Sequence, residues 1–408
     1  MNQLNWKHSI ARFLTAQTIS LFGSSLVQYA IVWYITLTTS SGKMLTISTM
    51  CGFLPQIVIS LFAGVWIDRY DRKKMIMLSD SAIALSTLLL AAAFLSGHKS
   101  VWFLFAALVV RSAGTGIQTP AVNAMIPQIV PKPYLMKVNG LNSTLSSMMM
   151  FLSPAASGAV LSVAPLEAAL FIDVLTAVIG VGITATIHAE PYEKRCLPGT
   201  AGLEEIRDGF RYLKDNQLIK RLLLFQITIL FLVSPSAFLT PLMVSRTFGS
   251  EVWRLTASEM TYSLGMVLGG ILIASWGGFK KRMNTTLAAG AVYGLIMIGL
   301  GNAGVFLLYL LFNTAIGITS PCYIAPVTVT IQEKVSPGMQ GRIFSFMQIA
   351  TSCALPLGML VFGPLADLVP VQYLLNSAGL MILIICCIVW KANGFSVESA
   401  TENIEQPL

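Results

Sequence analysis

Three ionisable side chains interrupt long apolar stretches of this sequence: Asp80, Arg111 and Asp173. Each stretch has about the 20 residues that a helix needs to cross a lipid bilayer. A charge there is costly unless it faces protein, water or an opposite charge. Asp173 and Arg111 are expected at similar depths, so we predict that Asp173, and less strongly Asp80, exchanges a proton while Arg111 tunes it. A static ion pair that only holds helices together fits these residues equally well.

The densest charged run of the first half extends from Gly64 to Lys74, between two apolar stretches. A glycine at its start allows close helix packing. Asp68 could accept hydrogen bonds from the free N–H groups that begin a distant helix. This predicts a latch that forms when the cytoplasmic side closes, whereas the alternative is a loop that only fixes topology. The residues of the predicted latch are Gly64, Asp68, Arg69, Arg72, Gly341 and Arg342.

The composition is that of a membrane protein. Of the 408 residues, 55% are apolar and 11% charged, and the mean hydropathy is +0.73. Soluble domains carry about 25% charged residues. The sequence predicts an all-α fold of twelve membrane-spanning helices. Their expected ranges are 10–37, 43–67, 75–96, 101–125, 138–163, 166–188, 218–246, 256–279, 283–301, 303–331, 341–366 and 371–390.

The net charge of +8 reflects topology. If the N-terminus is cytoplasmic, 21 of the 26 Lys and Arg residues fall in inner segments and four in outer loops. That asymmetry is typical of multi-pass proteins, whose inner loops are positively charged. The expected partner of the basic residues is therefore the lipid bilayer and not a nucleic acid, with both termini cytoplasmic.

The two halves of the chain resemble each other. The basic loop Arg72-Lys73-Lys74 corresponds to Lys280-Lys281-Arg282 in the second half. Such a repeat predicts two pseudo-symmetric six-helix bundles with a substrate cavity near the middle of the membrane. We expect bundles over 1–188 and 218–391, a cytoplasmic linker with an amphipathic helix over 189–217, and a disordered cytoplasmic tail over 392–408.

The second half offers little acid–base chemistry. None of its predicted helices has an ionisable residue clear of the helix ends, which assigns titratable groups to the first half. Prolines are expected to break the helices 218–246 and 303–331, at Pro235, Pro241, Pro321 and Pro326. The ligand is expected to be bulky and mainly apolar. The predicted cavity residues are Gln17, Gln28, Trp33, Gln118, Asn123, Asn142, Gln226 and Asn313.

Other chemistries lack their residues. The sequence has no phosphate-binding loop, no His-x-x-x-His pair and no Gly-x-Ser-x-Gly motif, and its cysteines have no metal-like spacing. We therefore expect neither an enzyme nor a metal or other cofactor. An ATP-binding partner protein stays an open alternative to direct coupling.

Several motifs resemble the major facilitator superfamily of transporters. The run from Gly64 resembles its loop signature Gly-x-x-x-Asp-Arg-x-x-Arg-Lys, with Asp71 where the family has glycine. Arg111-Ser-Ala-Gly-Thr-Gly resembles its fourth-helix signature. Ser-Pro154-Ala-Ala-Ser-Gly158 is similar to its antiporter signature Gly-Pro-x-x-Gly-Gly. Together with Gly52-Phe-Leu-Pro and Ile172-Asp-Val, these motifs resemble the macrolide-efflux-type branch.

The resemblance implies proton-driven antiport of a drug-like compound in the inner membrane of a bacterium. It makes efflux of bulky amphiphiles, foremost macrolide antibiotics, the leading hypothesis, with a small amphiphilic substrate and protons as the transported species. A second hypothesis keeps the fold and changes the cargo to a siderophore, metabolite or lysolipid. A third is a membrane receptor or assembly partner that transports nothing.

Overall fold

The computed structural model describes residues 3–187, 216–335 and 337–392, and all its regular elements there are helical. The amphipathic helix expected within 189–217 and the tail lie outside this part. The helices of the first half are α1 (Gln3–Thr39), α2 (Gly42–Arg69), α3 (Arg72–Leu95), α4 (Val101–Ile129), η1 (Lys132–Tyr134), α5 (Leu135–Val163) and α6 (Leu166–Ala185). Those of the second half are α8 (Gln217–Phe238), α9 (Thr240–Thr247), α10 (Val252–Trp276), α11 (Arg282–Gly301), α12 (Phe306–Lys334), α13 (Pro337–Leu365) and α14 (Val371–Lys391).

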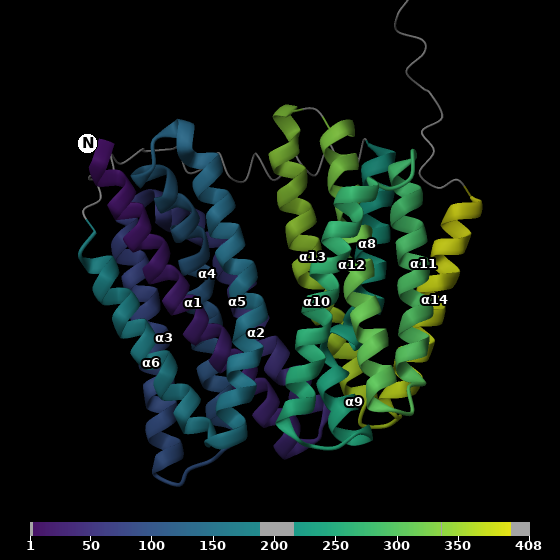
Figure 1. The fold of residues 1–408 in the computed structure, drawn as a ribbon, viewed down its shortest axis with the longest axis horizontal. Helices are drawn as coiled ribbons and strands as arrows, with labels where there is room; N and C mark the ends of the chain where they lie inside the picture. The colour runs from purple at the N-terminus through teal and green to yellow at the C-terminus, as the bar shows by residue number, and fades with distance from the viewer. Residues whose placement is uncertain (1–2, 188–215, 336, 393–408) are drawn as a thin grey trace, which may run out of the picture. The chain divides into compact units, whose positions relative to one another are not determined.

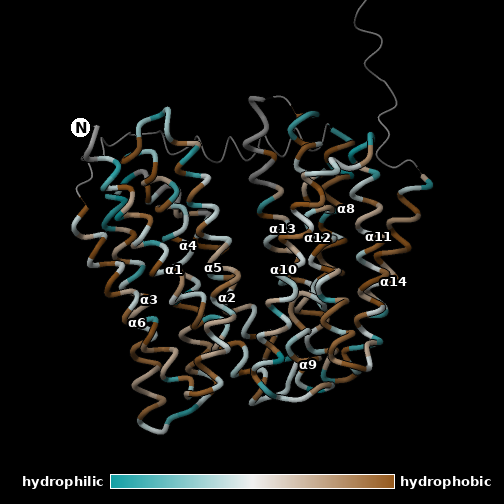
Figure 2. The backbone as a smooth tube through the Cα atoms, in the orientation of Figure 1, coloured by the Kyte–Doolittle hydropathy of each residue, from teal (hydrophilic) through white to brown (hydrophobic). Residues whose placement is uncertain are grey.

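Twelve helical segments within the described residues are long and apolar enough to cross a membrane, which confirms the predicted number. Figure 2 shows apolar residues along the helices and hydrophilic ones gathered toward many of their ends. A lipid interior offers no hydrogen bonds to the backbone, so a helix is the stable way to cross it.

The prolines act differently in the two halves of the prediction. The helix expected over 218–246 is interrupted at Leu239, and Pro241 lies in the first turn of α9, where a missing N–H leaves no bond unmade. By contrast, α12 continues through Pro321 and Pro326, so the predicted break there is wrong. Helices in membranes accommodate proline because neighbouring groups satisfy the freed carbonyls.

The chain forms two compact units that do not follow the midpoint of the sequence. The first comprises Met1–Leu197, Phe238–Ser263 and Gly363–Leu368. The second comprises Pro198–Ala237, Leu264–Phe362 and Val369–Leu408. The division into bundles over 1–188 and 218–391 stays a prediction.

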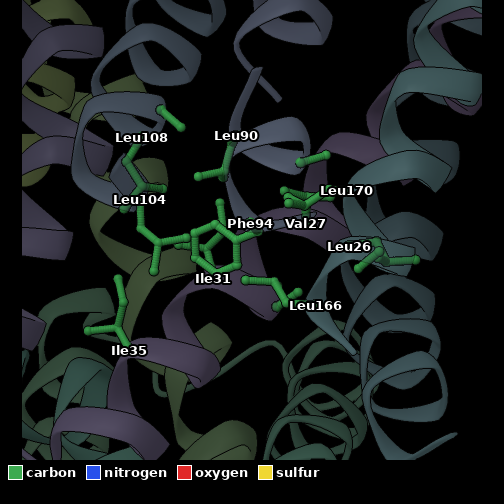
Figure 3. Packing of buried hydrophobic residues seen from close by; sticks show 14 of the residues in the cluster. Leu26, Val27, Ile31, Ile35, Leu90, Phe94, Leu104, Leu108, Leu166 and Leu170 are labelled. Carbon is green, nitrogen blue, oxygen red and sulfur yellow. The ribbon is translucent and has the colours of Figure 1, made fainter. Parts of the chain in front are cut away.

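In the first unit, α1 packs along α6 and α5, α3 packs between α4 and α6, and α2 packs on α4. Figure 3 shows one core of this unit, where leucine and isoleucine side chains from α1, α3, α4 and α6 surround Phe94. Many large apolar side chains remain exposed on the helices, such as Leu78 and Leu175. Lipid covers such surfaces in a membrane, so helix association there depends on close packing.

Glycines set the closest helix contacts of the second unit. Gly294 of α11 and Gly379 of α14 face each other, and a Cβ on either would lie 2.6–2.7 Å from the other's carbonyl oxygen. On α10, a Cβ at Gly269 would collide with the backbone of Ile318 in α12, whereas a Cβ at Gly270 would meet no atom within 4 Å. Small residues at helix interfaces allow this approach in lipid.

Gly269→Ala is expected to lower the thermal stability of the protein in detergent, because the new methyl group meets backbone that cannot rotate away. Overpacking of this kind costs about 1–3 kcal/mol. Gly270→Ala, its neighbour on the same helix, should leave the melting temperature unchanged or raise it slightly. Equal melting temperatures for the two variants would contradict the close contact between α10 and α12.

The charged run between α2 and α3 binds helix ends. Asp71 is the N-cap of α3, and its carboxylate accepts hydrogen bonds from the N–H groups of Lys73 and Lys74. Arg72 Nη1 donates to the carbonyl of Ala124 in α4, 2.8 Å away. The acid at the family's glycine position thus starts a helix, with a φ of −64° that needs no glycine.

Candidate functional site

A buried ion pair joins Arg111 of α4 to Asp173 of α6. The two residues are 4% and 0% exposed. Thr87 of α3 donates to Asp173 Oδ2 at 2.9 Å, and Ser24 of α1 donates to Oδ1 at 3.2 Å. Arg111 Nη2 also donates to the carbonyl of Ser24, at 2.9 Å. Four helices therefore contribute to one polar cluster, in which each oxygen of the carboxylate accepts a hydrogen bond.

Asp80 of α3 has a different environment. It is 2% exposed, and its Oδ1 accepts a hydrogen bond from Gln118 Nε2 at 2.6 Å. Ser20 of α1 is the other polar side chain that faces this carboxyl. Oδ2 has no hydrogen-bond partner within bonding geometry, and no ion pair of the described residues includes Asp80. Burial without a counter-ion penalises the ionised form of a carboxyl, so such a group tends to bind a proton.

A pocket of about 160 Å³ lies among α1, α4 and α5 in the same unit. Gln118 lines it, which connects the pocket to Asp80 through one hydrogen bond. The amide nitrogen of Gln17 is buried there without a hydrogen-bond partner. The residues that line the pocket are Gln17, Thr18, Leu21, Gln118, Thr119, Val122, Asn123, Asn142, Leu145 and Ser146.

The structure brings together four of the predicted cavity residues in this pocket, namely the glutamines and asparagines of α1, α4 and α5. Gln28 instead lies beside Gly52 of α2, and Trp33 is buried with its ring 5.7 Å from that of Tyr29. The remaining two, Gln226 and Asn313, belong to the second unit. There Gln226 accepts a hydrogen bond from the Tyr323 hydroxyl at 2.7 Å.

The proline motif of α5 packs against α10. Pro154 lies inside a continuous helix, and Ser153 and Ser157 beside it are fully buried. A Cβ at Gly158 would collide with the side chain of Thr256 in α10. Small residues here permit the close approach that the sequence predicts, while the antiporter role of the motif stays a prediction.

The predicted cytoplasmic latch cannot be followed to its partner. Gly64 and Asp68 belong to α2, but their side chains lie outside the described part, as do the surroundings of Gly341 and Arg342. Arg69 is exposed. The latch therefore stays a prediction.

A clasp that the sequence analysis missed lies at the start of α2. We define it as Asp367 with the residues it binds. Its carboxylate accepts hydrogen bonds from the Gly42 and Lys43 backbone N–H groups at 2.6 and 3.0 Å, and from the Ser41 hydroxyl at 2.9 Å. Asp367 follows α13 directly, so it caps a helix more than 300 residues earlier in the chain.

Arg246 of α9 completes the clasp. It forms an ion pair with Asp367 at 3.2 Å and donates to the carbonyls of Ala366 and Ser40 at 2.6 and 2.5 Å. Ser40 has a φ of +47°, a conformation that side chains rarely adopt. All of these residues belong to the first compact unit. Burial alone would raise the pKa of Asp367, but the hydrogen bonds from Lys43 and Gly42 outweigh it and hold that pKa below its usual 3.8.

Glu259 is a second residue that the sequence analysis missed. Because α10 begins at Val252 and not near 256, Glu259 is seven residues beyond the start of the helix. The expectation that the second half has no ionisable residue clear of a helix end is therefore wrong. An acid inside an apolar run was the available signal. A helix start estimated four residues late concealed it.

Comparisons with known proteins agree with this architecture. The Major Facilitator Superfamily profile matches residues 13–359. The chain is 30% identical to macrolide efflux protein A of Streptococcus pyogenes, over 94% of this chain and 96% of that protein. It is 32% identical to a macrolide efflux protein A of Enterococcus faecalis, over 78% of this chain and 99% of that one.

Solved structures show the same fold. A D-xylose–proton symporter superposes with a TM-score of 0.68 at 14% identity, covering 93% of this chain and 98% of the symporter. Twelve membrane-spanning helices, a family match over most of the sequence and structural neighbours of the same kind identify a multi-pass transporter and not an enzyme. The chain belongs to the Major Facilitator Superfamily.

Proposed function

We propose that this protein exports bulky amphiphilic compounds, foremost macrolide antibiotics, by alternating access driven by the proton gradient. Its similarity to macrolide efflux protein A along 94% of the chain carries the proposal. The buried acids of α3 and α6 support the coupling to protons, since carboxyls inside a membrane commonly form proton relays. We place the protein in the bacterial cytoplasmic membrane with both termini cytoplasmic, because basic residues favour that side.

Expression in a bacterial host without its own drug pumps is expected to raise the inhibitory concentration of macrolides, and an uncoupler should abolish the accompanying efflux of labelled drug. The physical reason is that export against a gradient needs the energy of proton entry. A panel of macrolides, other amphiphiles and metal-chelating metabolites checks the cargo. Efflux that survives collapse of the proton gradient would contradict the coupling, and unchanged macrolide susceptibility would contradict the cargo.

The two buried acids are suited to different roles. Asp173 faces Arg111 and accepts hydrogen bonds from two hydroxyls, so its negative charge is compensated. Asp80 has only neutral hydrogen-bonding neighbours, and Gln118 links it to the pocket. A carboxyl that can be neutral or charged at modest cost is the better proton carrier. We therefore assign proton exchange to Asp80, and to Asp173 the role of fixing Arg111.

Asp80→Asn is expected to abolish drug accumulation driven by an imposed proton gradient in proteoliposomes while retaining drug exchange at equal concentrations, which needs no net proton movement. Asp173→Asn should instead reduce the amount of folded protein, since leaving Arg111 unpaired costs about 3–5 kcal/mol. The double variant Arg111→Met/Asp173→Leu should recover part of that stability. Gradient-driven accumulation by Asp80→Asn at the wild-type rate would remove Asp80 from the relay.

The clasp has the features of an outer latch for the cycle. It joins α2, α9 and the segment after α13 through loops that the charge distribution places outside. A carboxylate bound to free N–H groups at a helix start is a strong yet reversible contact. We assign to it the stabilisation of the conformation that is closed on the outer side.

Asp367→Asn is expected to shift the protein toward the outward-open conformation. The measurement is the rate at which a membrane-impermeant thiol reagent modifies Gln28→Cys in a variant without native cysteines. We expect about a tenfold rise, since charged hydrogen bonds contribute about 1.5–3 kcal/mol. Glu167→Gln is the matched control, because it breaks an outer ion pair with Lys99 that joins only helices of the first half.

The effect of pH is part of this test. A lowered pKa means that Asp367 stabilises the clasp above its ordinary value of 3.8 and loses this contribution only as pH falls through the lowered value. The difference between wild type and Asp367→Asn should therefore be constant from about pH 5.5 to 8. A difference that disappears at the acid end would make Asp367 a proton-coupled group, and equal labelling of both proteins would refute the latch.

A further inference from the structure

Glu259 lies inside α10, and none of the described cations pairs with it. It follows Val252 by seven residues and is half-buried. The nearest basic residue on the same helix, Arg254, forms an ion pair with Glu251 at 3.0 Å. No ion pair or hydrogen bond of the described residues includes Glu259. An ionisable side chain held within a membrane-spanning helix without a partner indicates a functional site.

The surroundings of Glu259 are aromatic. Thr256, one turn earlier on the same face of α10, contacts Gly158 of α5. The Glu259 carboxyl is close enough to the Tyr29 hydroxyl of α1 to act on it electrostatically, and Tyr262 acts on the same hydroxyl. The ring of Tyr29 is in turn 5.7 Å from that of Trp33, which is buried and fixes it from behind. These residues all belong to the first compact unit.

The three acids within membrane-spanning helices of the first unit differ in access. Asp80 and Asp173 are 2% and 0% exposed, so only a proton reaches them without rearrangement. Glu259 is half-buried, which leaves its carboxylate open to a larger group. A negative charge beside aromatic rings is the arrangement that proteins use for organic cations, because the ring faces add a cation–π attraction.

We propose that Glu259, with the ring of Tyr29, binds the protonated amine of the transported compound and makes the protein selective for cationic amphiphiles. The proposal rests on the proposed export function and narrows its substrate class. An amine on an apolar scaffold offers the missing counter-charge for Glu259 and apolar surface for the surrounding helices. Neutral compounds gain nothing from the carboxylate, and anionic chelators are repelled by it.

The test compares two probes that differ only in charge: an amine-bearing macrolide and the same molecule with its amine acetylated. Glu259→Gln should reduce efflux of the amine-bearing probe about tenfold, the usual scale for losing one partner of a desolvated charge pair. Efflux of the acetylated probe should change less than about twofold. Equal loss of both probes, or loss of neither, overturns the assignment.

Two variants control for structure. Glu251→Gln removes an acid just before the same helix, already paired with Arg254, and should leave both probes unaffected. Tyr29→Phe keeps the aromatic face and should retain selectivity, whereas Tyr29→Leu should weaken efflux of the amine-bearing probe alone. If Tyr29→Leu and Tyr29→Phe behave alike, the ring does not bind the cation.

A binding measurement separates this proposal from the export function. Purified protein in detergent is titrated with tetraphenylphosphonium, a lipophilic cation, with triphenylmethane as its neutral counterpart. Glu259→Gln should weaken binding of the cation about tenfold without altering the neutral probe. That result would support the site even if macrolides prove not to be exported. Unchanged affinity for the cation refutes the site whether or not the wild type exports macrolides.

Discussion

The Arg111–Asp173 ion pair expresses the constraint on which the first unit depends: inside a bilayer, a charge needs a partner supplied by the protein. Neither residue reaches solvent, and the cluster around them takes groups from α1, α3, α4 and α6. The same four helices form the apolar core of Figure 3. Because lipid tails are as apolar as leucine, apolar burial alone orients helices weakly, and a polar cluster with fixed geometry specifies their rotation.

The same constraint makes the remaining acids informative. Asp80 has neutral partners and a path to the pocket through Gln118, whereas Glu259 has no partner of its own. The three carboxyls form a series from compensated, through neutral hydrogen-bonding, to uncompensated. Their possible roles follow that order: fixing a helix arrangement, carrying a proton and binding a cation.

At the membrane surface, charges act on helix ends. Asp71 caps α3, Arg72 binds a carbonyl of α4, and Asp367 caps α2. Helix termini carry partial charges and unpaired backbone groups, so a single side chain there can connect distant segments. The clasp at Asp367 differs from the other two because it joins residues more than 300 positions apart, and such a contact is able to report on a change of conformation.

The sequence by itself determined the membrane class, the twelve helices, the superfamily and the depth at which Arg111 and Asp173 meet. These follow from hydropathy, charge asymmetry and helical rise, which are local properties. Only the tertiary structure decided that Asp80 lacks a cation, that three predicted polar residues of α4 and α5 share a pocket with Gln17, and that Asp367 reaches α2. The physical reason is helix rotation: a turn of one residue, about 100°, moves a side chain from lipid to core, and an apolar sequence marks that angle weakly. Glu259 lay between the two cases, because an error of four residues in one helix start hid an acid that the letters display openly.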